Sequence, residues 1–393
     1  MTRTIARLVA ALPRLLLSAA LNALPALLLA PAAQAAPTYT VTVLGGAGSE
    51  ARDINEAGQV VGYITSGDSF HAFFHDGGAL HDLGTLGYER SFAQGLNDDG
   101  TVVGTAYSAG ARQAFVYASG VVSALPFDGL SDASDINNAG LIVGGKSFPD
   151  GQGGTYIHAY KYVGGVATDL GTVPDGYNSF SEGVNEAGYV TGTVEVGGAP
   201  NYPSHPFLYT TGPLQDLGDF GGVFGHGYAI NNHDQVVGTA GRFSSDDLPG
   251  DIYPRRAFLY QNGVLQDLGS LLTNGSSIAN DINDAGLIVG VTATVDETVD
   301  SAFLYIDGQM VLLDSLIDPD SGWTIQNAEG INELGQIAGT ACQAGLCYAV
   351  RLDLAPAVPE PATPWMLGSG LVGLGLARRA RSRIATDDAR SGT

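Results

Sequence analysis

Residues 49–62 read SEARDINEAGQVVG, and six variants of this stretch follow along the chain. Each copy contains one Asn that serves as a common anchor for comparing them. The seven anchors are Asn55, Asn97, Asn137, Asn185, Asn231, Asn283 and Asn332. A repeat at this spacing indicates one large domain made of similar small units, although 393 residues would suffice for two or three separate domains.

The residues around each anchor predict a strand, a tight turn and a second strand. An apolar residue precedes every Asn, and the side chain four positions before it is always Ala, Ser or Gly. The pattern Asn-x-x-Gly then favours a hairpin turn, because Asn supplies local hydrogen bonds and Gly accepts a positive φ. Six copies have this Gly, whereas the fifth has Asp234. A short apolar run ending in Gly, such as Val60-Val61-Gly62, forms the second strand.

Two further strands complete each unit. The third alternates aromatic residues, as Phe115 and Tyr117 do, and the fourth ends in Asp-Leu-Gly in four units. Four short strands per unit are typical of a β-propeller blade. The seventh unit lacks a fourth strand, and residues 39–45 at the front of the chain have the pattern of that strand. We therefore predict an all-β, seven-bladed β-propeller of four-stranded blades, closed by the N-terminal strand. An open β-solenoid is the alternative, but it would not need this offset.

The units resemble the HAF-type extracellular repeat, which is named for the His-Ala-Phe found here at His71. The resemblance covers roughly residues 40–352 and recurs in every unit. It implies a β-propeller and an extracellular location, and it implies no particular chemistry.

Residues 1–35 have the pattern of a signal peptide. Three arginines in the first 14 residues give a positive start, an apolar stretch follows, and Ala33-Gln34-Ala35 is a small-residue cleavage site. Cleavage after Ala35 would leave residues 36–355 as the propeller domain. An N-terminal membrane anchor is the alternative.

Residues 356–383 carry a second targeting segment. Pro359, Glu360 and Pro361 precede an uncharged apolar stretch, which we expect to be a hydrophobic helix, and then a cluster of arginines. This order resembles the PEP-CTERM sorting signal of Gram-negative bacteria that make exopolysaccharide. It implies that a membrane exosortase recognises the triplet and passes the protein, after transient anchoring, to the envelope or outside. A simple C-terminal membrane anchor is the alternative, and residues 384–393 are expected to be a disordered tail.

Charge limits the partners. Residues 36–358 contain 9 Lys and Arg against 37 Asp and Glu, a net charge of −28. So acidic a body cannot neutralise phosphates, which excludes nucleic acid as a partner. Acidity keeps an exported protein soluble and favours cations or cationic partners.

The only cysteines, Cys342 and Cys347, lie in the last unit. In an exported protein we expect them to form a disulfide across a short hairpin. A metal site with two thiolates lacks further ligands nearby, and two free thiols are the remaining alternative.

The loops between second and third strands vary most in length between units. In a propeller they share one face with the connections between blades, so that face is the expected binding surface. The longest of these loops, residues 239–256, holds Asp246, Asp247, Asp251 and Tyr253. Its carboxylates could hold calcium or, with aromatic help, contact sugar hydroxyls. A solvated loop without a ligand is the alternative, and no other cofactor is expected.

Two sets of residues recur at single repeat positions. Asp53, Asp135 and Asp281 lie two residues before their anchors, on the strand expected to line a central channel. They would either form a cation site there or, more often, support the turn by hydrogen bonds. Histidines at positions 71, 158 and 205 share another position, where Gln, Arg and Ser stand in other units. That mixture favours a polar role at the strand end over metal binding.

The sequence contains no catalytic motif of the G-x-S-x-G or H-E-x-x-H type. We therefore expect a non-enzymatic repeat protein of the envelope or biofilm matrix that binds polysaccharide or a cell-surface component through variable loops. The alternative is a carbohydrate-active hydrolase or lyase whose acidic residues come from different blades.

Overall fold

The structure is a computed structural model that describes residues 37–151, 153–197, 203–242, 255–272, 275–294 and 300–355. These ranges are all-β, with no α-helix and with two short 3-10 helices, η1 (Leu313–Leu316) and η2 (Pro319–Ser321). No helix within them has the length and apolar character needed to cross a bilayer. The two targeting segments and the loop residues Asp246, Asp247, Asp251 and Tyr253 lie outside the described residues.

The strands form five sheets of four strands and one sheet of eight. The first two sheets are β2 (Glu50–Ile54), β3 (Val60–Ser66), β4 (Ser69–His75) and β5 (Leu80–Gly84), then β6 (Arg90–Leu96), β7 (Val102–Ser108), β8 (Ala111–Ala118) and β9 (Val121–Ala124). The third sheet is β10 (Asp135–Ile136), β11 (Ile142–Pro149), β12 (Thr155–Val163) and β13 (Val166–Gly171).

The eight-stranded sheet comes next along the chain. Its strands are β14 (Ser179–Val184), β15 (Val190–Glu195), β16 (Ser204–Tyr209), β17 (Gln215–Asp216), β18 (Gly221–Ile230), β19 (Val236–Arg242), β20 (Arg255–Gln261) and β21 (Val264–Gly269). The last two sheets are β22 (Ser276–Ile282), β23 (Ile288–Ala293), β24 (Asp300–Ile306) and β25 (Gln309–Leu312), then β26 (Thr324–Ile331), β27 (Ile337–Gln343) and β28 (Leu346–Leu354) with β1 (Tyr39–Val43).

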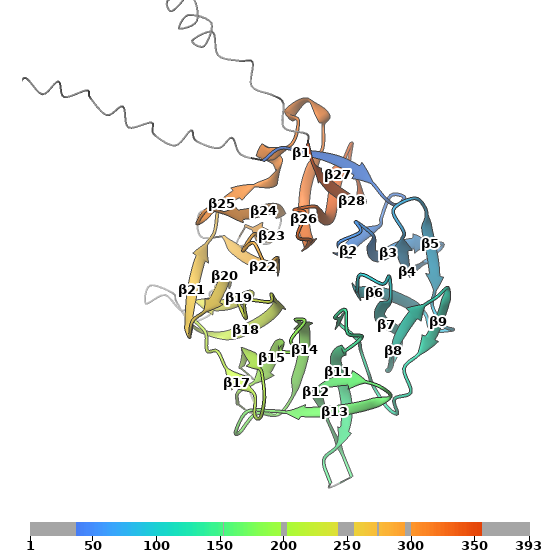
Figure 1. The fold of residues 1–393 in the computed structure, drawn as a ribbon, viewed down its shortest axis with the longest axis vertical. Coiled ribbons are helices and arrows are strands. Elements are labelled where there is room, and N and C mark those ends of the chain that lie inside the picture. The colour runs from blue at the N-terminus through green and yellow to red at the C-terminus, as the bar shows by residue number, and fades with distance from the viewer. Residues whose placement is uncertain are drawn as a thin grey trace, which may run out of the picture. The chain divides into compact units, whose positions relative to one another are not determined.

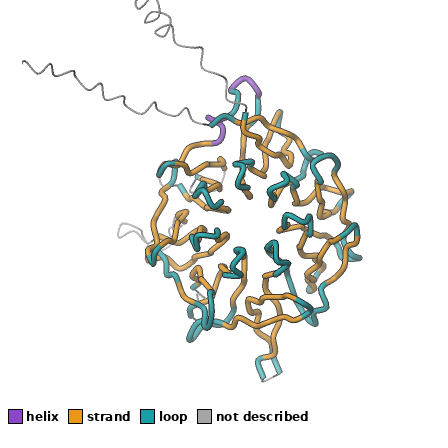
Figure 2. The backbone as a smooth tube through the Cα atoms, viewed as in Figure 1, coloured by secondary structure: helices purple, strands orange, loops and turns teal. Residues whose placement is uncertain are grey.

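Sets of four strands therefore recur along the described chain. The eight-stranded sheet consists of two such sets joined by a single parallel bridge between Ser204 and Phe224. The last set takes its fourth strand from the beginning of the chain, because β1 pairs with β28 from Tyr39↔Leu354 to Val43↔Val350. Within residues 37–355, Figure 1 shows the sets following one another around a common centre, with first strands such as β2, β6 and β14 nearest to it. In Figure 2 the loops closest to this centre are the turns that follow the first strands.

The core lies between neighbouring sets. Phe74 and Ala93 belong to one apolar cluster that joins the first two sets, and Phe73 and Ala338 belong to another that joins the last set to the first. Each of the first six third strands buries a large aromatic ring completely, at Phe73, Phe115, Tyr160, Phe207, Phe258 and Phe303. Burying such a ring contributes about 1.5–3 kcal/mol, so packing between sets is a principal source of stability.

A β-bulge interrupts the first strand of most sets. In β6, Ala93 pairs with Gly104, and the next pair begins at Gly95, so that Gln94 has no partner residue. The glycine opposite is sterically required, because a Cβ on Gly104 would lie 2.2 Å from the carbonyl oxygen of Phe92. The last glycine of every copy has an equivalent contact, at 1.9–2.2 Å. The small residue and the final glycine of the repeat therefore mark a close approach of two backbones.

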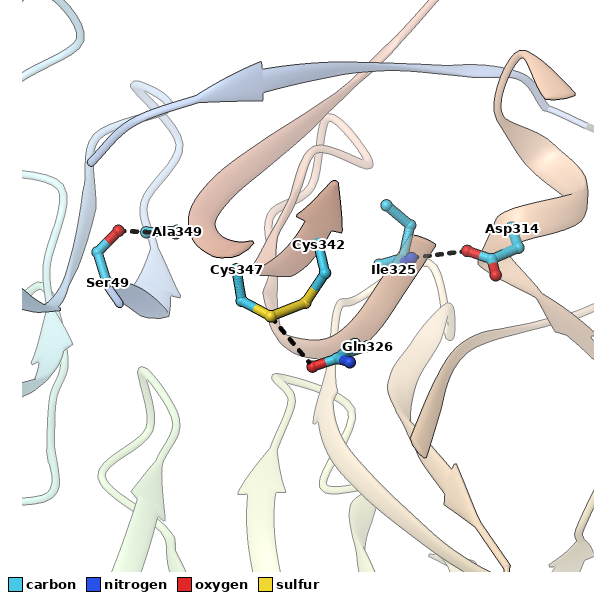
Figure 3. The surroundings of a disulfide bond; sticks show 7 residues. All are labelled: Ser49, Asp314, Ile325, Gln326, Cys342, Cys347 and Ala349. Carbon is cyan, nitrogen blue, oxygen red and sulfur yellow. Dashed lines mark hydrogen bonds between the residues drawn. A yellow bond between two sulfur atoms is a disulfide. The ribbon is translucent and has the colours of Figure 1, made fainter. Parts of the chain in front are cut away.

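Cys342 and Cys347 form a disulfide across the hairpin between β27 and β28 (Figure 3). Next to it, the Ala349 N–H donates to Ser49 Oγ at 2.9 Å and so ties the last set to the first. Both crosslinks act where the two ends of the domain meet.

Replacing both cysteines by Ser is expected to lower the free energy of unfolding by about 2 kcal/mol, since the crosslink closes only a short loop. Mass spectrometry of the unreduced exported protein should find neither Cys342 nor Cys347 open to alkylation. Alkylation of both thiols in that material would contradict the pairing.

Candidate functional site

Each anchor Asn holds its own turn. In the first copy the Gly58 N–H donates to the Asn55 carbonyl at 3.0 Å, and Asn55 Oδ1 accepts the Gln59 N–H at 3.0 Å. Gly58 takes a φ of +72°, and Asp234 takes +60° at the same place in the fifth copy. The tight turn that the sequence predicts is therefore present, and Asp is one of the few other residues that tolerate this conformation.

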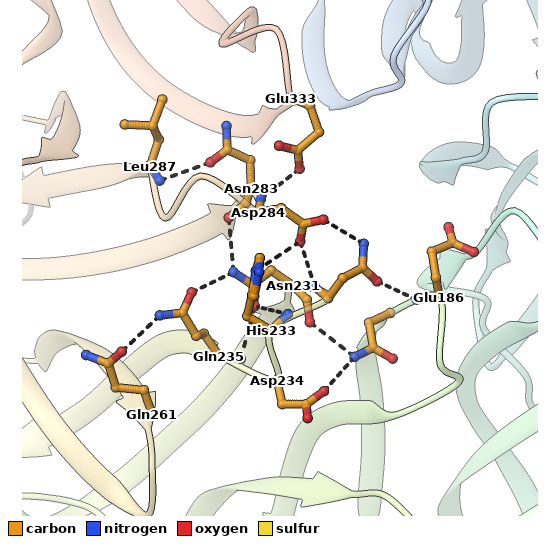
Figure 4. Close-up of polar contacts among 12 residues, drawn as sticks. Glu186, Asn231, His233, Asp234, Gln235, Gln261, Asn283, Asp284, Leu287 and Glu333 are labelled. Atoms are coloured by element: carbon orange, nitrogen blue, oxygen red, sulfur yellow. Dashed lines mark hydrogen bonds and ion pairs between the residues drawn. The ribbon is translucent and has the colours of Figure 1, made fainter.

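The anchors also link the sets to one another. Asn55 Nδ2 donates to the main-chain oxygen of Asn97 at 3.0 Å, and each later anchor donates to the next in the same way. Asn332 Nδ2 donates to the Asn55 oxygen at 3.0 Å, so the series returns to its start. Figure 4 shows the step from Asn231 to Asn283. Asn has both the oxygen for the turn and the N–H donor for the neighbouring set, and neither Asp nor Gly has both.

A second series of bonds runs through the residues that directly follow the anchors. The Glu56 N–H donates to Asp98 Oδ1 at 3.0 Å, and after five similar bonds the Glu333 N–H donates to Glu56 Oε1 at 2.8 Å. We call this end of the domain the anchor-turn face, defined by Glu56, Asp98, Asn138, Glu186, Asn232, Asp284 and Glu333. Each of these side chains accepts a backbone N–H from a neighbouring set, which gives this face a structural role.

The first strands line a central cavity of about 390 Å³. Half of its lining residues lie three positions before an anchor, one from each set. They are Arg52, Gln94, Ser134, Glu182, Tyr228, Asn280 and Glu329, and we call them the bulge residues. In six sets this is the residue that the bulge leaves unpaired. A bulge commonly redirects a side chain in this way. The cavity therefore presents a different polar side chain from almost every copy.

Asp53, Asp135 and Asp281 also line this cavity. Each carboxylate accepts two backbone N–H groups, one from the following residue and one from the next set; Asp53 accepts from Ile54 at 2.7 Å and from Leu96 at 2.9 Å. The bonds thus connect neighbouring sets rather than support the turn, which corrects the sequence-based expectation. In the described part of the chain, no cluster of His, Cys, Asp and Glu is arranged to hold a metal ion.

Burial changes the acidity of the cavity. Removal from water raises the pKa of Asp281 to about 7 and that of Asp135 to about 6, although backbone hydrogen bonds oppose the shift. For Asp53, burial and the charges of Asp135 and Asp281 raise the pKa well above its usual range. Glu182 has a pKa raised to about 8 by burial and by the nearby charge of Asp132. At neutral pH Glu182 is therefore largely protonated and Asp281 about half protonated, and a protonated carboxyl can donate a hydrogen bond.

These raised pKa values predict that stability falls as pH rises. The folded state binds more protons than the unfolded state between about pH 4 and pH 8. The contribution of these carboxyls to the free energy of unfolding is therefore complete below pH 4 and declines up to pH 8. In Glu182→Gln the free energy of unfolding should decline by about 2 kcal/mol less than in the wild type. This value is smaller than the full pKa shift would give, because solvent partly screens a half-buried group. Thermal melting at pH 5 and pH 9 measures the difference, with the exposed Glu89→Gln as control. An equal fall in melting temperature from pH 5 to pH 9 in the two variants would contradict the raised pKa of Glu182.

A smaller pocket of about 270 Å³ adjoins the central cavity. It is lined by Arg52, Arg90, Phe92, Gln94 and Tyr107, and two of these, Arg52 and Gln94, also line the cavity. We call it the arginine pocket.

Aromatic rings surround this pocket. The Tyr63 and Phe92 rings meet edge to face at 5.0 Å, and Phe92 and Tyr107 do so at 5.7 Å. Phe70 lies 5.3 Å from Tyr63 and is 38% exposed. The aromatic surface therefore continues from the pocket towards solvent.

The histidines of the third strands have a different role from metal binding. His71 Nδ1 lies 2.9 Å from the carboxylate of Asp82, eleven residues later, and two other pairs repeat this geometry. They are His158 with Asp169 at 3.0 Å and His205 with Asp216 at 2.8 Å. Each Asp is the first residue of an Asp-Leu-Gly. The shared spacing in three units was the sequence signal for these pairs.

Comparison with known proteins identifies the C-terminal segment. Residues 357–381 match the PEP-CTERM protein-sorting motif. The chain carries an exosortase sorting signal. Such a signal marks an exported, envelope-associated protein, and Pro359, Glu360 and Pro361 lie inside the matched range. Residues 213–351 match a family model described as a protein of unknown function (DUF3466), whereas the HAF-repeat assignment stays a prediction. No curated protein matches the chain.

Solved structures with a similar fold are β-propellers. One is the β-propeller domain of the Trilobed protease from Pyrococcus furiosus, which is described as having an open velcro topology. It is 9% identical to this chain, with a TM-score of 0.47, and the match covers 80% of this chain and 99% of that one. YCF48 bound to D1 peptide is 10% identical with a TM-score of 0.47, over 84% and 99%. TolB from Acinetobacter baumannii is 12% identical with a TM-score of 0.43, over 64% of this chain and 62%, less than two thirds, of its own length. Such a likeness concerns the fold alone.

Proposed function

We propose that residues 36–355 form one seven-bladed β-propeller that β1 closes, between a signal peptide at residues 1–35 and the sorting segment at 356–383. Two observations support this proposal. The Asn hydrogen bonds return from Asn332 to Asn55, and β1 pairs with β28. Pairing with β1 gives the last set four strands, as in the other sets, and holds the two ends of the domain in one sheet.

We further propose that this exported protein is a non-enzymatic binder of the envelope or extracellular matrix. It holds a polysaccharide at the end of the domain opposite the anchor-turn face, where the variable loops and the blade-to-blade connections lie. We call this end the loop face. The observation that carries the proposal is the set of seven bulge residues around one cavity.

The chemistry of the cavity favours a hydroxyl-rich ligand. Its walls contain amide, hydroxyl, guanidinium and carboxyl groups, and Glu182 and Asp281 have pKa values that keep them largely or partly protonated near neutral pH. Such groups both donate and accept hydrogen bonds, as sugar hydroxyls do. The aromatic surface around Phe70 and Tyr63 adds flat apolar faces for the C–H groups of a sugar ring.

The anchor-turn face is less suited to binding. Its ring of side chains is engaged with backbone N–H groups of neighbouring sets, as Asp98 is with Glu56 and Glu56 is with Glu333. A ligand there would have to replace hydrogen bonds that hold the sets together. Towards the loop face, neighbouring sets are also joined by hydrogen bonds, as where the Ala72 N–H donates to Ser91 Oγ, but the serines of this series are buried, so a ligand would not have to displace them.

A glycan array probed with the purified exported protein tests the binding proposal. We expect retention of at least one class of polysaccharide, and competition by the free polymer. Absence of binding to every polysaccharide on the array would overturn the proposal.

A hydrolase or lyase of polysaccharides is the second candidate, and Glu182 favours it. A half-buried carboxyl with a pKa of about 8 is suited to act as a general acid. Incubating the protein with any polymer it binds, and measuring new reducing ends, separates the two candidates. Cleavage by the wild type that Glu182→Gln abolishes would establish the enzyme, and binding without cleavage would support the binder.

A further inference from the structure

Two arginines converge on the arginine pocket of an otherwise acidic domain. Residues 36–358 contain only 9 Lys and Arg, and Arg52 and Arg90 both line this one pocket. Among the described residues, the only arginines in an ion pair are Arg112 and Arg351. Neither Arg52 nor Arg90 therefore has a carboxylate within ion-pair distance, and the charge of Arg52 acts on Glu329 only at longer range.

Aromatic rings lie beside both guanidinium groups. Arg90 Cζ lies 6.0 Å from the Phe92 ring centre and 5.8 Å from that of Tyr107, and Arg52 Cζ lies 5.7 Å from that of Tyr63. A guanidinium has five N–H donors, so contact with a ring leaves donors for a ligand. A planar guanidinium matches a carboxylate, which it binds through two parallel hydrogen bonds.

We propose that the arginine pocket is a subsite for a carboxylate-bearing sugar residue of an acidic polysaccharide, a hexuronate unit. This inference rests on the proposed function, because it names the class of polymer that the loop face binds. Arg90 and Arg52 hold the carboxylate, and the sugar ring lies against the aromatic surface of Phe92 and Tyr107. The neighbouring sugar residue lies in the central cavity, because Arg52 and Gln94 line both spaces.

Pocket size and charge support a sugar over a longer acidic segment. A volume of about 270 Å³ is at the lower limit for small-molecule sites, so it accommodates one ring. The net charge of −28 repels any polyanion at long range. That repulsion is screened beyond about 8 Å at physiological ionic strength, whereas the direct arginine contact is not. Recognition must therefore depend on this local contact.

Polygalacturonate and its methyl-esterified form are matched probes, since esterification removes the charge and keeps the sugar ring. We expect the full exported protein to bind polygalacturonate at least tenfold more tightly than the ester. Arg90→Gln should remove this preference, because it weakens binding of polygalacturonate at least tenfold more than binding of the ester. Arg242→Gln, which removes an exposed charge at the end of β19, is the control and should keep the preference. Melting temperatures would verify that both variants fold.

Four outcomes would overturn the subsite. The first two are equal affinity for the acid and the ester, and an equal loss of affinity for polygalacturonate in Arg90→Gln and Arg242→Gln. The third is binding to neutral polymers alone. The fourth is displacement of bound polygalacturonate by polyglutamate as efficiently as by free polygalacturonate. Binding to neutral polymers alone would leave the proposed function standing. Absence of binding to any polysaccharide would overturn the proposed function itself, so the two failures are distinguishable.

Discussion

Asn283→Asp is expected to lower the free energy of unfolding by about 3–5 kcal/mol at neutral pH, because it places an unpaired charge in a buried position. Asn283 is 3% exposed, and its Nδ2 donates to the Asn332 oxygen at 3.1 Å. Asp keeps the oxygen that accepts the Leu287 N–H but replaces the donor by a second oxygen, which faces a carbonyl. Part of the loss should be recovered near pH 4, where a protonated Asp can donate again.

Denaturant unfolding of this variant beside Asn262→Asp measures the effect. Asn262 is exposed and has a φ of +53°, a conformation that Asp also tolerates, so this control should change stability by less than about 0.5 kcal/mol. Equal small losses in the two variants would mean that the bonds between anchors contribute little to stability.

Gly192→Ala is the second large expected effect, with a loss of about 3 kcal/mol or more. A Cβ at this position would lie 1.9 Å from the carbonyl oxygen of Phe180 and 2.8 Å from Cα of Ser181. Both atoms are backbone, so neither can move without disturbing the pairing of β14 with β15. The variant should yield little folded protein, or melt well below the wild type.

Gly46→Ala is the matched control, because nothing lies within 4 Å of the Cβ it adds. It should fold and melt like the wild type. A Gly192→Ala protein as stable as Gly46→Ala would show that the first two strands separate at no cost, which contradicts the close packing of the repeat.

Local patterns in the sequence were sufficient to predict much of the fold. Short-range rules of turn and strand formation predict the Asn-x-x-Gly turn and the aromatic third strand. They also predict that residues 39–45 form a strand, which completes the last set. The structure has the predicted turn at Asn55, and β1 pairs with β28. Strand pairing across more than 300 residues was predictable because the missing strand of one unit appeared intact at the other end of the chain.

The sequence predicted that Asp53, Asp135 and Asp281 line a central channel, and they line the cavity, but it did not predict the bulge residues, for a physical reason. A bulge depends on the register between two strands, and a period-2 pattern read along one strand does not reveal it. The sequence pattern therefore presents Gln94 as an ordinary member of a strand. Its signal was variation: the small residue before it is nearly uniform between copies, whereas this position holds a new polar side chain in almost every copy. The hydrogen bonds from Asp53 to Leu96 depend on the same displaced register.

The two ends of the domain emerge with different roles. On the anchor-turn face, charged side chains such as Asp98 and Glu333 serve backbone groups of neighbouring sets. The cavity and the arginine pocket use polar groups that vary from copy to copy. A repeat with a uniform turn and a variable bulge residue thus separates the part that links neighbouring sets from the part that we propose binds a ligand.

Calorimetric titration of the polysaccharide that binds best on the array tests the central claim most directly. It compares the wild type, Tyr228→Ala in the cavity and Glu333→Gln on the anchor-turn face. The account predicts at least a tenfold loss of affinity for Tyr228→Ala, in a protein that still melts cooperatively, and unchanged affinity for Glu333→Gln. Unchanged affinity for Tyr228→Ala together with a loss for Glu333→Gln would place the ligand on the opposite face and contradict the account.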